Sequence, residues 1–274
     1  MYISKPQHYQ DGKSVNRAAD MNILIVNPNS TQSMTEGLKP LLADLASANL
    51  SLHFFTAPSD APPSIDDART SALSTSVTFS ALQSILKDAR SSESTDVKIR
   101  YSGYLVACFS SHPLTPLLRS RTTAPVLNIF EAALLHARAL AMPFGIVTTG
   151  QYWEAVLENG AKEFFSGRDV DNATTSPATD EINVAGFVGV RSTGLTAAQL
   201  HLTEREVVDR RIADASADLV GQGARAIILG CAGMSGMEDA IRVGAQRHGR
   251  EVRIIDGVRA GVVLLEGLVK TNAV

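Results

Sequence analysis

The chain has few of the residues from which several common kinds of site are built. Of its 274 residues, two are cysteine and 5% are aromatic, and the formal net charge is −3 at pH 7. Two distant cysteines do not make a zinc site, and in a reducing compartment they argue against a structural disulfide. Because the charge is nearly balanced and lysine and arginine do not cluster, the sequence has no electrostatic footprint for nucleic acid or an anionic membrane. We therefore expect a small-molecule partner.

Long apolar runs and cofactor motifs are also missing. No stretch approaches the roughly 20 apolar residues of a membrane span, and residues 1–20 lack the apolar core of a signal peptide. We expect residues 1–20 to be a disordered leader, either native or an expression remnant, and the protein to be cytoplasmic. The histidines show no metal-ligand spacing, and Gly230, Gly233 and Gly236 lack the Gly-Lys-Ser/Thr ending of a phosphate loop. We therefore expect no metal and no cofactor.

What is present is an alternation of short β-rich runs with longer helical patterns, which is typical of parallel α/β architecture. A hydrophobic content of 45% and the chain length indicate about two domains. Helical patterns include residues 65–86, 203–220 and 258–269, and Ser/Thr/Asp-rich loops are expected at 91–96 and 166–180. Strands are predicted at 22–27, 51–56, 103–108 and 125–129, and then at 144–148, 186–191, 226–230 and 252–256.

Landmarks in the two halves of the chain repeat in the same order, at a nearly constant interval of about 120 residues. We predict two pseudo-symmetric α/β domains, each a short, mostly parallel sheet flanked by helices. The first comprises residues 21–124 plus about 257–274, so that the last helix returns to it, and the second comprises 125–256. Ligands of parallel sheets bind outside the carboxyl ends of the strands, so the active site is expected in the cleft between the domains. The matched landmarks are Asn27 with Thr149, Cys108 with Cys231, and Asn128 with Asp256.

Each cysteine ends an apolar run and opens a loop of small residues. Leu105-Val106-Ala107 precedes Cys108, and Ile227-Ile228-Leu229-Gly230 precedes Cys231. A strand-to-helix loop favours the thiolate, because helix N-termini stabilise negative charge. A lone cysteine at a strand end is more often an inert, buried side chain. Two at matching positions instead predict acid/base chemistry on the two faces of one carbon.

Polar groups follow the first strand of each half. The loop Asn27-Pro28-Asn29-Ser30-Thr31 contains preferred N-cap residues, and Ser33-Met34-Thr35-Glu36 has capping-box spacing. The N–H groups that need a cap can also hold an enolate or carboxylate oxygen. Thr148-Thr149-Gly150 repeats the arrangement in the second half. His112 lies four residues past Cys108, but the adjacent Pro113 favours a structural over a catalytic role for its imidazole.

These segments together resemble the Asp/Glu racemase superfamily and, within it, the hydantoin racemase branch, which includes fungal homologues linked to allantoin metabolism. The resemblance runs from Met21 to about Leu268. Each segment alone is weak, whereas the ordered set is specific. It is carried by Asn27-Pro28-Asn29-Ser30-Thr31, Ala107-Cys108-Phe109-Ser110, Val147-Thr148-Thr149-Gly150, Leu229-Gly230-Cys231-Ala232-Gly233-Met234 and Asp256-Gly257-Val258.

The resemblance implies a cofactor-free enzyme in which Cys108 and Cys231 are the acid and base. One departure concerns Ser111, where bacterial members commonly have an acidic residue. Loss of that carboxylate changes which ring N–H or side-chain group the pocket can satisfy. The residues implied to surround the substrate are Asn29, Ser30, Phe109, Ser110, Ser111, Thr149, Ala232 and Gly233.

We therefore predict racemisation at the acidic carbon of a 5-substituted hydantoin or of allantoin. Racemisation of aspartate or glutamate is the nearest alternative, although no arginine lies in the cysteine or Asn/Thr loops and Arg259 is the nearest candidate. Isomerisation of an unsaturated diacid also uses paired cysteines. A catalytically silent small-molecule binding protein is the alternative of another class. The natural substrate and assembly into a homo-oligomer are left open.

Overall fold

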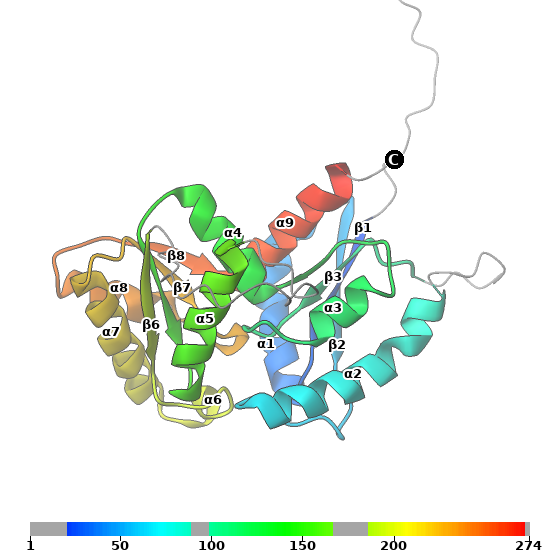
Figure 1. The fold of residues 1–274 in the computed structure, drawn as a ribbon, viewed down its shortest axis with the longest axis horizontal. Coiled ribbons are helices and arrows are strands. Elements are labelled where there is room, and N and C mark those ends of the chain that lie inside the picture. The colour runs from blue at the N-terminus through cyan, green and yellow to red at the C-terminus, as the bar shows by residue number, and fades with distance from the viewer. Residues whose placement is uncertain (1–20, 89–98, 167–185, 272–274) are drawn as a thin grey trace, which may run out of the picture.

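The computed structural model describes residues 21–88, 99–166 and 186–271. The expected leader at 1–20, the loop at 91–96 and residues 167–180 lie outside this part. Two four-stranded sheets lie side by side, and every strand pair in both is parallel (Figure 1). The strands are β1 (Met21–Asn27), β2 (Leu50–Thr56), β3 (Gly103–Val106), β4 (Val126–Asn128), β5 (Phe144–Thr148), β6 (Phe187–Ser192), β7 (Ala226–Leu229) and β8 (Arg253–Asp256).

The two sheets have the same topology, with orders β2-β1-β3-β4 and β6-β5-β7-β8. Each strand of the first sheet therefore has a counterpart four strands later. The eight predicted strands are all present, and the pseudo-symmetric α/β fold is confirmed. The helices are α1 (Gln32–Leu42), α2 (Ala68–Asp88), α3 (Leu114–Arg119), α4 (Ile129–Leu140), α5 (Tyr152–Ser166), α6 (Gln199–Leu202), α7 (Arg205–Gly221), α8 (Glu238–Gln246) and α9 (Gly257–Thr271), with short 3-10 turns η1 (Ala43–Leu45) and η2 (Ala232–Met234).

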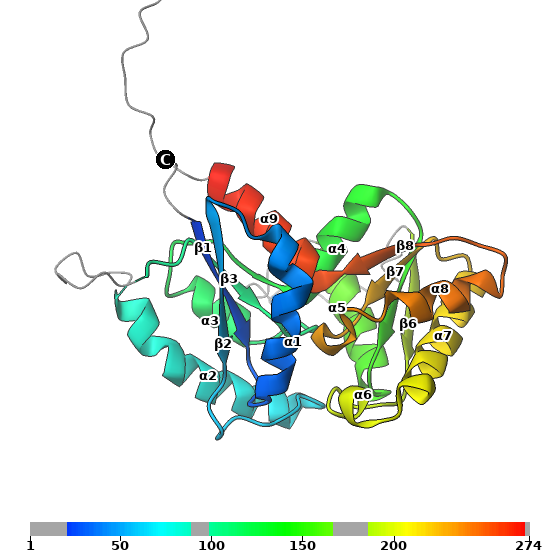
Figure 2. The ribbon, with the colours of Figure 1, turned by 180° about the vertical axis from the view of Figure 1, so that it is seen from behind.

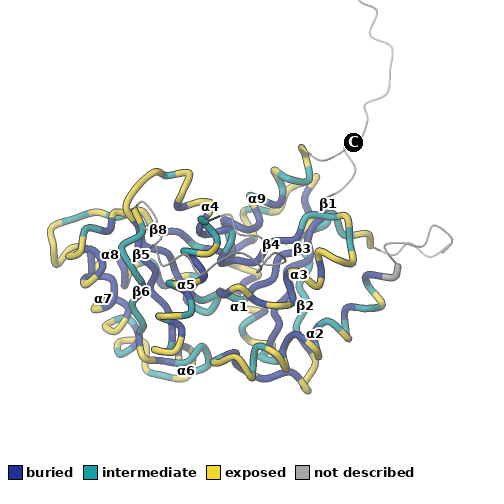
Figure 3. Tube along the Cα trace, viewed as in Figure 1, coloured by how far each residue is buried: buried dark blue, intermediate teal, exposed yellow. Residues whose placement is uncertain are grey.

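The continuous apolar runs of the strands are buried on both faces of each sheet, as parallel sheets require. In β1, Ile23 and Ile25 point into a core shared by the two halves, whereas Leu24 and Val26 pack under α2 and α3. Helices α7 and α8 cover the outer face of the second sheet. Figure 3 shows the resulting buried strands between more exposed helices. The sheets are thus held in a fixed relation by one continuous core.

One helix from each half packs against the sheet of the other half. Helix α4 follows β4 of the first sheet but contacts β7 and β8 of the second, and α9 follows β8 but packs on β1 and β3 (Figures 1 and 2). The predicted return of the last helix is therefore observed. Strand β4 pairs with β3 and so belongs to the first sheet, whereas the predicted boundary between residues 124 and 125 assigns it to the second domain. The chain instead crosses between the halves at the start of α4.

The crossing points are capped alike. Asn128 accepts a hydrogen bond from the Glu131 N–H at 2.8 Å in a full capping box, and the Asp256 carboxylate accepts from the N–H of Val258 at 2.7 Å. These caps satisfy N–H groups that the first helical turn leaves unpaired. The matched positions 128 and 256 of the sequence therefore mark the starts of the two exchanged helices.

Element ends differ from the predicted ones where loops take over. Strands β3 and β7 stop at Val106 and Leu229, before the cysteines rather than at or next to them. Helix α2 begins at Ala68, three residues later than expected. Among the described residues, no helix is both long and apolar enough to cross a membrane.

Candidate active site

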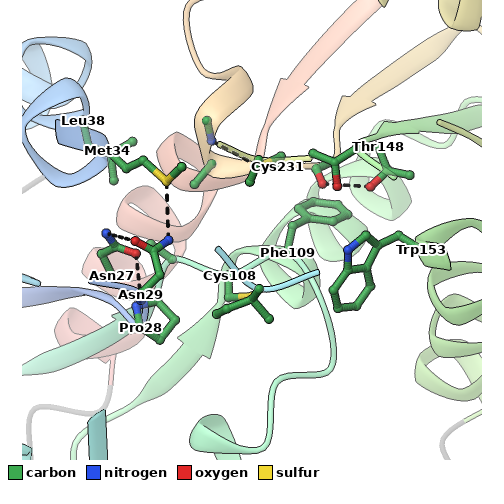
Figure 4. A pocket seen from close by; sticks show the side chains of 17 residues that line it. Asn27, Pro28, Asn29, Met34, Leu38, Cys108, Phe109, Thr148, Trp153 and Cys231 are labelled. Atoms are coloured by element: carbon green, nitrogen blue, oxygen red, sulfur yellow. Dashed lines mark hydrogen bonds between the residues drawn. The ribbon is translucent and has the colours of Figure 1, made fainter. Parts of the chain in front are cut away.

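The two cysteines line one cavity between the sheets (Figure 4). Each lies two residues past the end of a strand, Cys108 after β3 and Cys231 after β7, and these strands are counterparts. Both are free thiols, partly exposed to the cavity. Figure 4 shows them on opposite sides of it. The empty volume is about 590 Å³, including space open to solvent.

The neighbours of the two sulfur atoms differ. Cys108 Sγ lies 3.6 Å from the hydroxyl of Ser110. Cys231 caps the 3-10 turn η2, and its Sγ accepts a hydrogen bond from the N–H of Gly233 at 3.4 Å. Each thiol thus has one polar contact within its own loop.

Burial dominates the acidity of both thiols. It raises the pKa of Cys108 to about 12, which the Ser110 hydroxyl offsets only in part. Burial also raises the pKa of Cys231 to about 11. The hydrogen bond from the Gly233 N–H lowers this pKa in part, and the negative charge of Asp66 raises it further. The expectation that a helix start lowers the pKa of these thiols is therefore wrong, because a hydrogen bond from one N–H does not offset the removal of a thiolate from water. Negative charge on Cys231 also raises the pKa of Cys108, which favours at most one thiolate in the pair.

The loop after β1 is held by its own amides. Asn27 Nδ2 donates to Asn29 Oδ1 and to Thr35 Oγ1, both at 3.0 Å, and the N–H of Thr31 donates to Asn29 Oδ1 at 2.9 Å. Within the described chain, the Nδ2 group of Asn29 has only the Met34 sulfur, a weak acceptor, as its partner. This amide is therefore available to donate to a ligand.

The predicted capping box at 33–36 does not form. Helix α1 begins at Gln32, so Ser33 is already inside it, and the N-cap Thr31 makes no side-chain capping bond. The buried amides of Asn27 and Asn29 order the start of the helix instead.

The second half contributes a similar wall after β5. Thr148 Oγ1 donates to the carbonyl of Gly230 at 3.2 Å, which ties this loop to the Cys231 loop. Thr149 is buried, and its hydroxyl makes no hydrogen bond within the described chain. Trp153, the second residue of α5, closes the side of the cavity. One free hydroxyl and one aromatic face thus border the space between the thiols.

Five of the eight residues predicted to surround a substrate line the cavity and three do not. Ser30 is turned to the loop before α2, where its N–H donates to the carbonyl of Pro62. Ser110 is buried against Cys108, and exposed Ser111 lies beside Gly160 of α5. The five that line the cavity are Asn29, Phe109, Thr149, Ala232 and Gly233.

Sequence reasoning missed other parts of the wall. Trp153 is the single tryptophan of the chain, and this scarcity was the one available signal. Ala107 and Gly230 adjoin the cysteines, and Asn27, Pro28 and Thr148 belong to loops whose other members were predicted, whereas Met34, Leu38, Ile65 and Ala197 come from segments that only the folded chain brings to the cavity. The residues missed are Asn27, Pro28, Met34, Leu38, Ile65, Ala107, Thr148, Trp153, Ala197 and Gly230.

His112 is structural in its contacts, as expected from its sequence neighbours. Its Nδ1 accepts the N–H of Leu114 at 3.2 Å, and its Nε2 lies 3.3 Å from the hydroxyl of Ser74. That hydroxyl donates to the carbonyl of Pro28 at 2.6 Å. Burial lowers the pKa of His112 to about 4. A neutral imidazole therefore joins the Cys108 loop to the loop after β1.

No charged side chain is among the residues that line the cavity in the described part of the chain. Arg259, the nearest arginine suggested by the sequence, donates to both carboxylate oxygens of Asp44 and to the carbonyl of Leu41. The charge that acts on the site is that of Asp66, which precedes α2. The electrostatics therefore favour a neutral ligand over a dicarboxylate.

The family profile described as Asp/Glu/Hydantoin racemase matches residues 23–265. An uncharacterized protein of Schizosaccharomyces pombe is 31% identical over 253 residues, covering 92% of this chain and 93% of its own. A hydantoin racemase of Rhizobium meliloti is 28% identical over 253 residues, covering 90% and 88%.

Solved structures share the fold. An allantoin racemase from Klebsiella pneumoniae superposes with a TM-score of 0.69 at 24% identity, covering 92% of this chain and 88% of its own. An allantoin racemase from Pseudomonas fluorescens gives 0.70 at 23% identity, covering 92% of each chain. At these identities the similarity shows the two-sheet architecture alone.

Proposed function

Because this chain belongs to the Asp/Glu/hydantoin racemase family, we propose that it racemises a 5-substituted hydantoin or allantoin with Cys108 and Cys231 as its two acid/base groups. Membership of the family makes the protein a racemase in the broad sense. The names of bacterial relatives and of structural neighbours suggest the ring substrates. The choice of residues and of substrate is the proposal.

The observation that carries the proposal is the placement of the two thiols. They are free, they follow counterpart strands, and they line one cavity from opposite sides. In a two-base reaction, the thiolate on one face removes the proton from the substrate carbon while the thiol on the other face delivers one. Because the charge of one cysteine opposes ionisation of the other, the two thiols do not ionise together, which leaves the second one protonated when the first is a thiolate, as this chemistry needs.

The intermediate carries negative charge on the oxygen of the carbonyl group next to the acidified carbon. Donors already in place stabilise such charge better than water that must reorient. Asn29 Nδ2, held by its loop with only a thioether partner, and the free Thr149 hydroxyl are the donors that border the cavity. They reach the site from opposite halves of the molecule.

The charge distribution supports a neutral ring over an amino diacid. Aspartate, glutamate and unsaturated diacids carry carboxylates that call for cationic partners. The described lining has none, Arg259 is engaged by Asp44, and Asp66 would repel an anion. A hydantoin ring presents only N–H and carbonyl groups, which amide and hydroxyl side chains satisfy.

The test is a substrate panel in heavy water, comprising 5-substituted hydantoins, allantoin, aspartate and glutamate. Deuterium uptake and loss of optical rotation are followed together. We expect both for the ring compounds and neither for the amino acids. The double variant Cys108→Ser/Cys231→Ser is the matched control and corrects for spontaneous racemisation.

Turnover of aspartate or glutamate in preference to the rings would refute the substrate assignment. Binding of a hydantoin without deuterium exchange would instead identify a catalytically silent binding protein.

A further inference from the structure

A racemase with two thiols must restore their protons after each turnover. When the Cys108 thiolate takes a proton and the Cys231 thiol gives one, the pair ends with its protonation states exchanged. The next turnover in the same direction requires Cys231 to regain a proton from solvent and Cys108 to lose one. Burial that raises the pKa of both thiols also slows their access to water. A group that carries the proton would therefore speed the cycle.

The glycine at position 233 opens a gap beside the Cys231 thiol. An ideal Cβ on Gly233 would lie 3.6 Å from Cys231 Sγ and 2.9 Å from Nε2 of His201. The second distance is shorter than real Cβ contacts, so a side chain here would displace the imidazole. His201 lies on α6, and Ala197 in the preceding loop lines the cavity. The absence of a side chain thus leaves a gap with the imidazole on one side and the thiol on the other, and no hydrogen bond joins the two groups directly in the described chain.

The imidazole is suited to carry a proton. Its ring makes no hydrogen bond within the described chain, and the residue is exposed to solvent. Partial burial lowers the pKa of His201 below 6.5, so the ring is a neutral base near pH 7. Among the described residues, Asp66, before α2, is the titratable group that raises the pKa of Cys231 from another element, and Cys231 in turn raises the pKa of Cys108, after β3.

No histidine of the described residues faces Cys108 in a comparable way. The polar contact of Cys108 is the Ser110 hydroxyl, which does not titrate in the physiological range. The imidazole of His112, nearest in sequence, is engaged by Leu114 and Ser74. The two thiols are therefore unequal in their route to solvent.

We propose that His201 is the residue through which Cys231 exchanges its proton with solvent, by way of a water molecule in the gap that Gly233 leaves between them. The Sγ–H bond breaks as the proton passes to the water in the gap, and that water gives one of its protons to Nε2, which leaves a thiolate, an unchanged water and an imidazolium; the imidazolium then releases its proton to bulk water. The reverse sequence reprotonates the thiolate. Its role in turnover rests on the proposed racemase function, but the exchange itself does not.

The decisive measurement needs no substrate. With cysteine-selective ¹³C labelling, the two Cβ resonances report replacement of S–H by S–D in heavy water. We expect His201→Gln to slow exchange at Cys231 by about tenfold or more, the scale of general acid/base effects, and to leave Cys108 unchanged. Gly233→Ala should do the same with His201 retained. His136→Gln, an exposed histidine on α4, is the control and should change neither rate. Unchanged exchange at Cys231 in His201→Gln overturns the proposal.

Kinetics give a second readout if the ring compounds are turned over. If the free enzyme restores the protonation states of its thiols more slowly after product release, kcat falls and kcat/KM is unaltered. We expect this split in His201→Ala, with recovery on adding imidazole, which a structural role would not show. A fall in kcat/KM equal to that in kcat, without rescue, counts against the proposal. If racemisation stands and thiol exchange is unaffected, the inference on His201 alone fails. If racemisation is absent, the exchange experiment still decides it.

Discussion

At the scale of single residues, the site is a pair of weakly acidic thiols among neutral donors. Cys108 and Cys231 titrate far above neutrality because the cavity removes their thiolates from water. The amide of Asn29 and the hydroxyl of Thr149 add polarity without charge. Such a site is suited to moving protons on a neutral carbon acid.

Serine variants of the two cysteines should separate their tasks, since a serine hydroxyl keeps the shape but is far too weak an acid to act as base. Cys108→Ser and Cys231→Ser should each reduce racemisation by about a thousandfold or more. Each should retain deuterium exchange, without inversion, for one enantiomer, and the two should differ in which one. Exchange by mass spectrometry and inversion by polarimetry check this. Full racemisation by either variant would contradict the paired-thiol mechanism.

At the scale of elements, the active-site geometry depends on the two exchanged helices. Helices α4 and α9 start beside each other, and an ideal Cβ on Gly257 would lie 2.5 Å from the carbonyl oxygen of Ile129. Only glycine permits this approach of one helix start to the other. Because these starts follow β4 and β8, their contact sets how the two sheets, and hence the two thiols, face each other.

Gly257→Ala should therefore destabilise the fold by about 1–3 kcal/mol, since backbone must move to admit the methyl group. Gly267→Ala, on the same helix α9 with nothing within 4 Å, is the matched control. It should stabilise by about 0.5–1 kcal/mol through helix propensity. Urea unfolding measures both. Equal effects of the two substitutions would contradict the close approach.

At the scale of the whole molecule, the cavity exists only because the halves fold as one body. The shared core includes Ile23 and Leu105 of the first sheet together with Ile146 and Ile228 of the second. Burial of the thiols is a consequence of that packing. Their acidity is therefore linked to global stability.

Stability should fall in alkali for this reason. The folded thiols, with pKa values of about 12 and about 11, keep their protons above the ordinary value of 9.0, at which the unfolded thiols ionise. Ionisation then favours the unfolded chain as the pH rises from about 9 towards 11 and 12. Cys108→Ser/Cys231→Ser should lose less stability over this range, by urea unfolding at each pH. A parallel decline of the two proteins would contradict the raised pKa values.

Metal removal should leave the activity intact. The described residues hold no group of three or more His, Cys, Asp or Glu side chains that could bind a metal ion. We expect racemisation to survive dialysis against a chelator, whereas alkylation of the thiols should abolish it. Loss on chelation with recovery on adding a divalent ion would place the chemistry elsewhere.

The sequence by itself determined the strands, their repeated order and the matched positions of the cysteines. These follow from local patterns, because a buried parallel strand reads as a short apolar run and the loop after it begins where the run ends. The helix caps at Asn128 and Asp256 could be predicted in the same way, because each is a cap-forming residue at the end of an apolar run. The domain boundary at residue 124 stays a prediction, and the exchange of α4 and α9 is a packing event that no local pattern encodes.

Only the tertiary structure decided what surrounds the thiols. Ile65 and Ala197 enter the wall from loops remote from both cysteines, and Ser111 turns outward although it is three residues from Cys108. The direction of the pKa shifts was decided there too. A helix start favours a thiolate through one or two nearby N–H groups, but desolvation depends on every atom packed around the sulfur. That sum is set by contacts between distant segments, which the order of residues alone does not display.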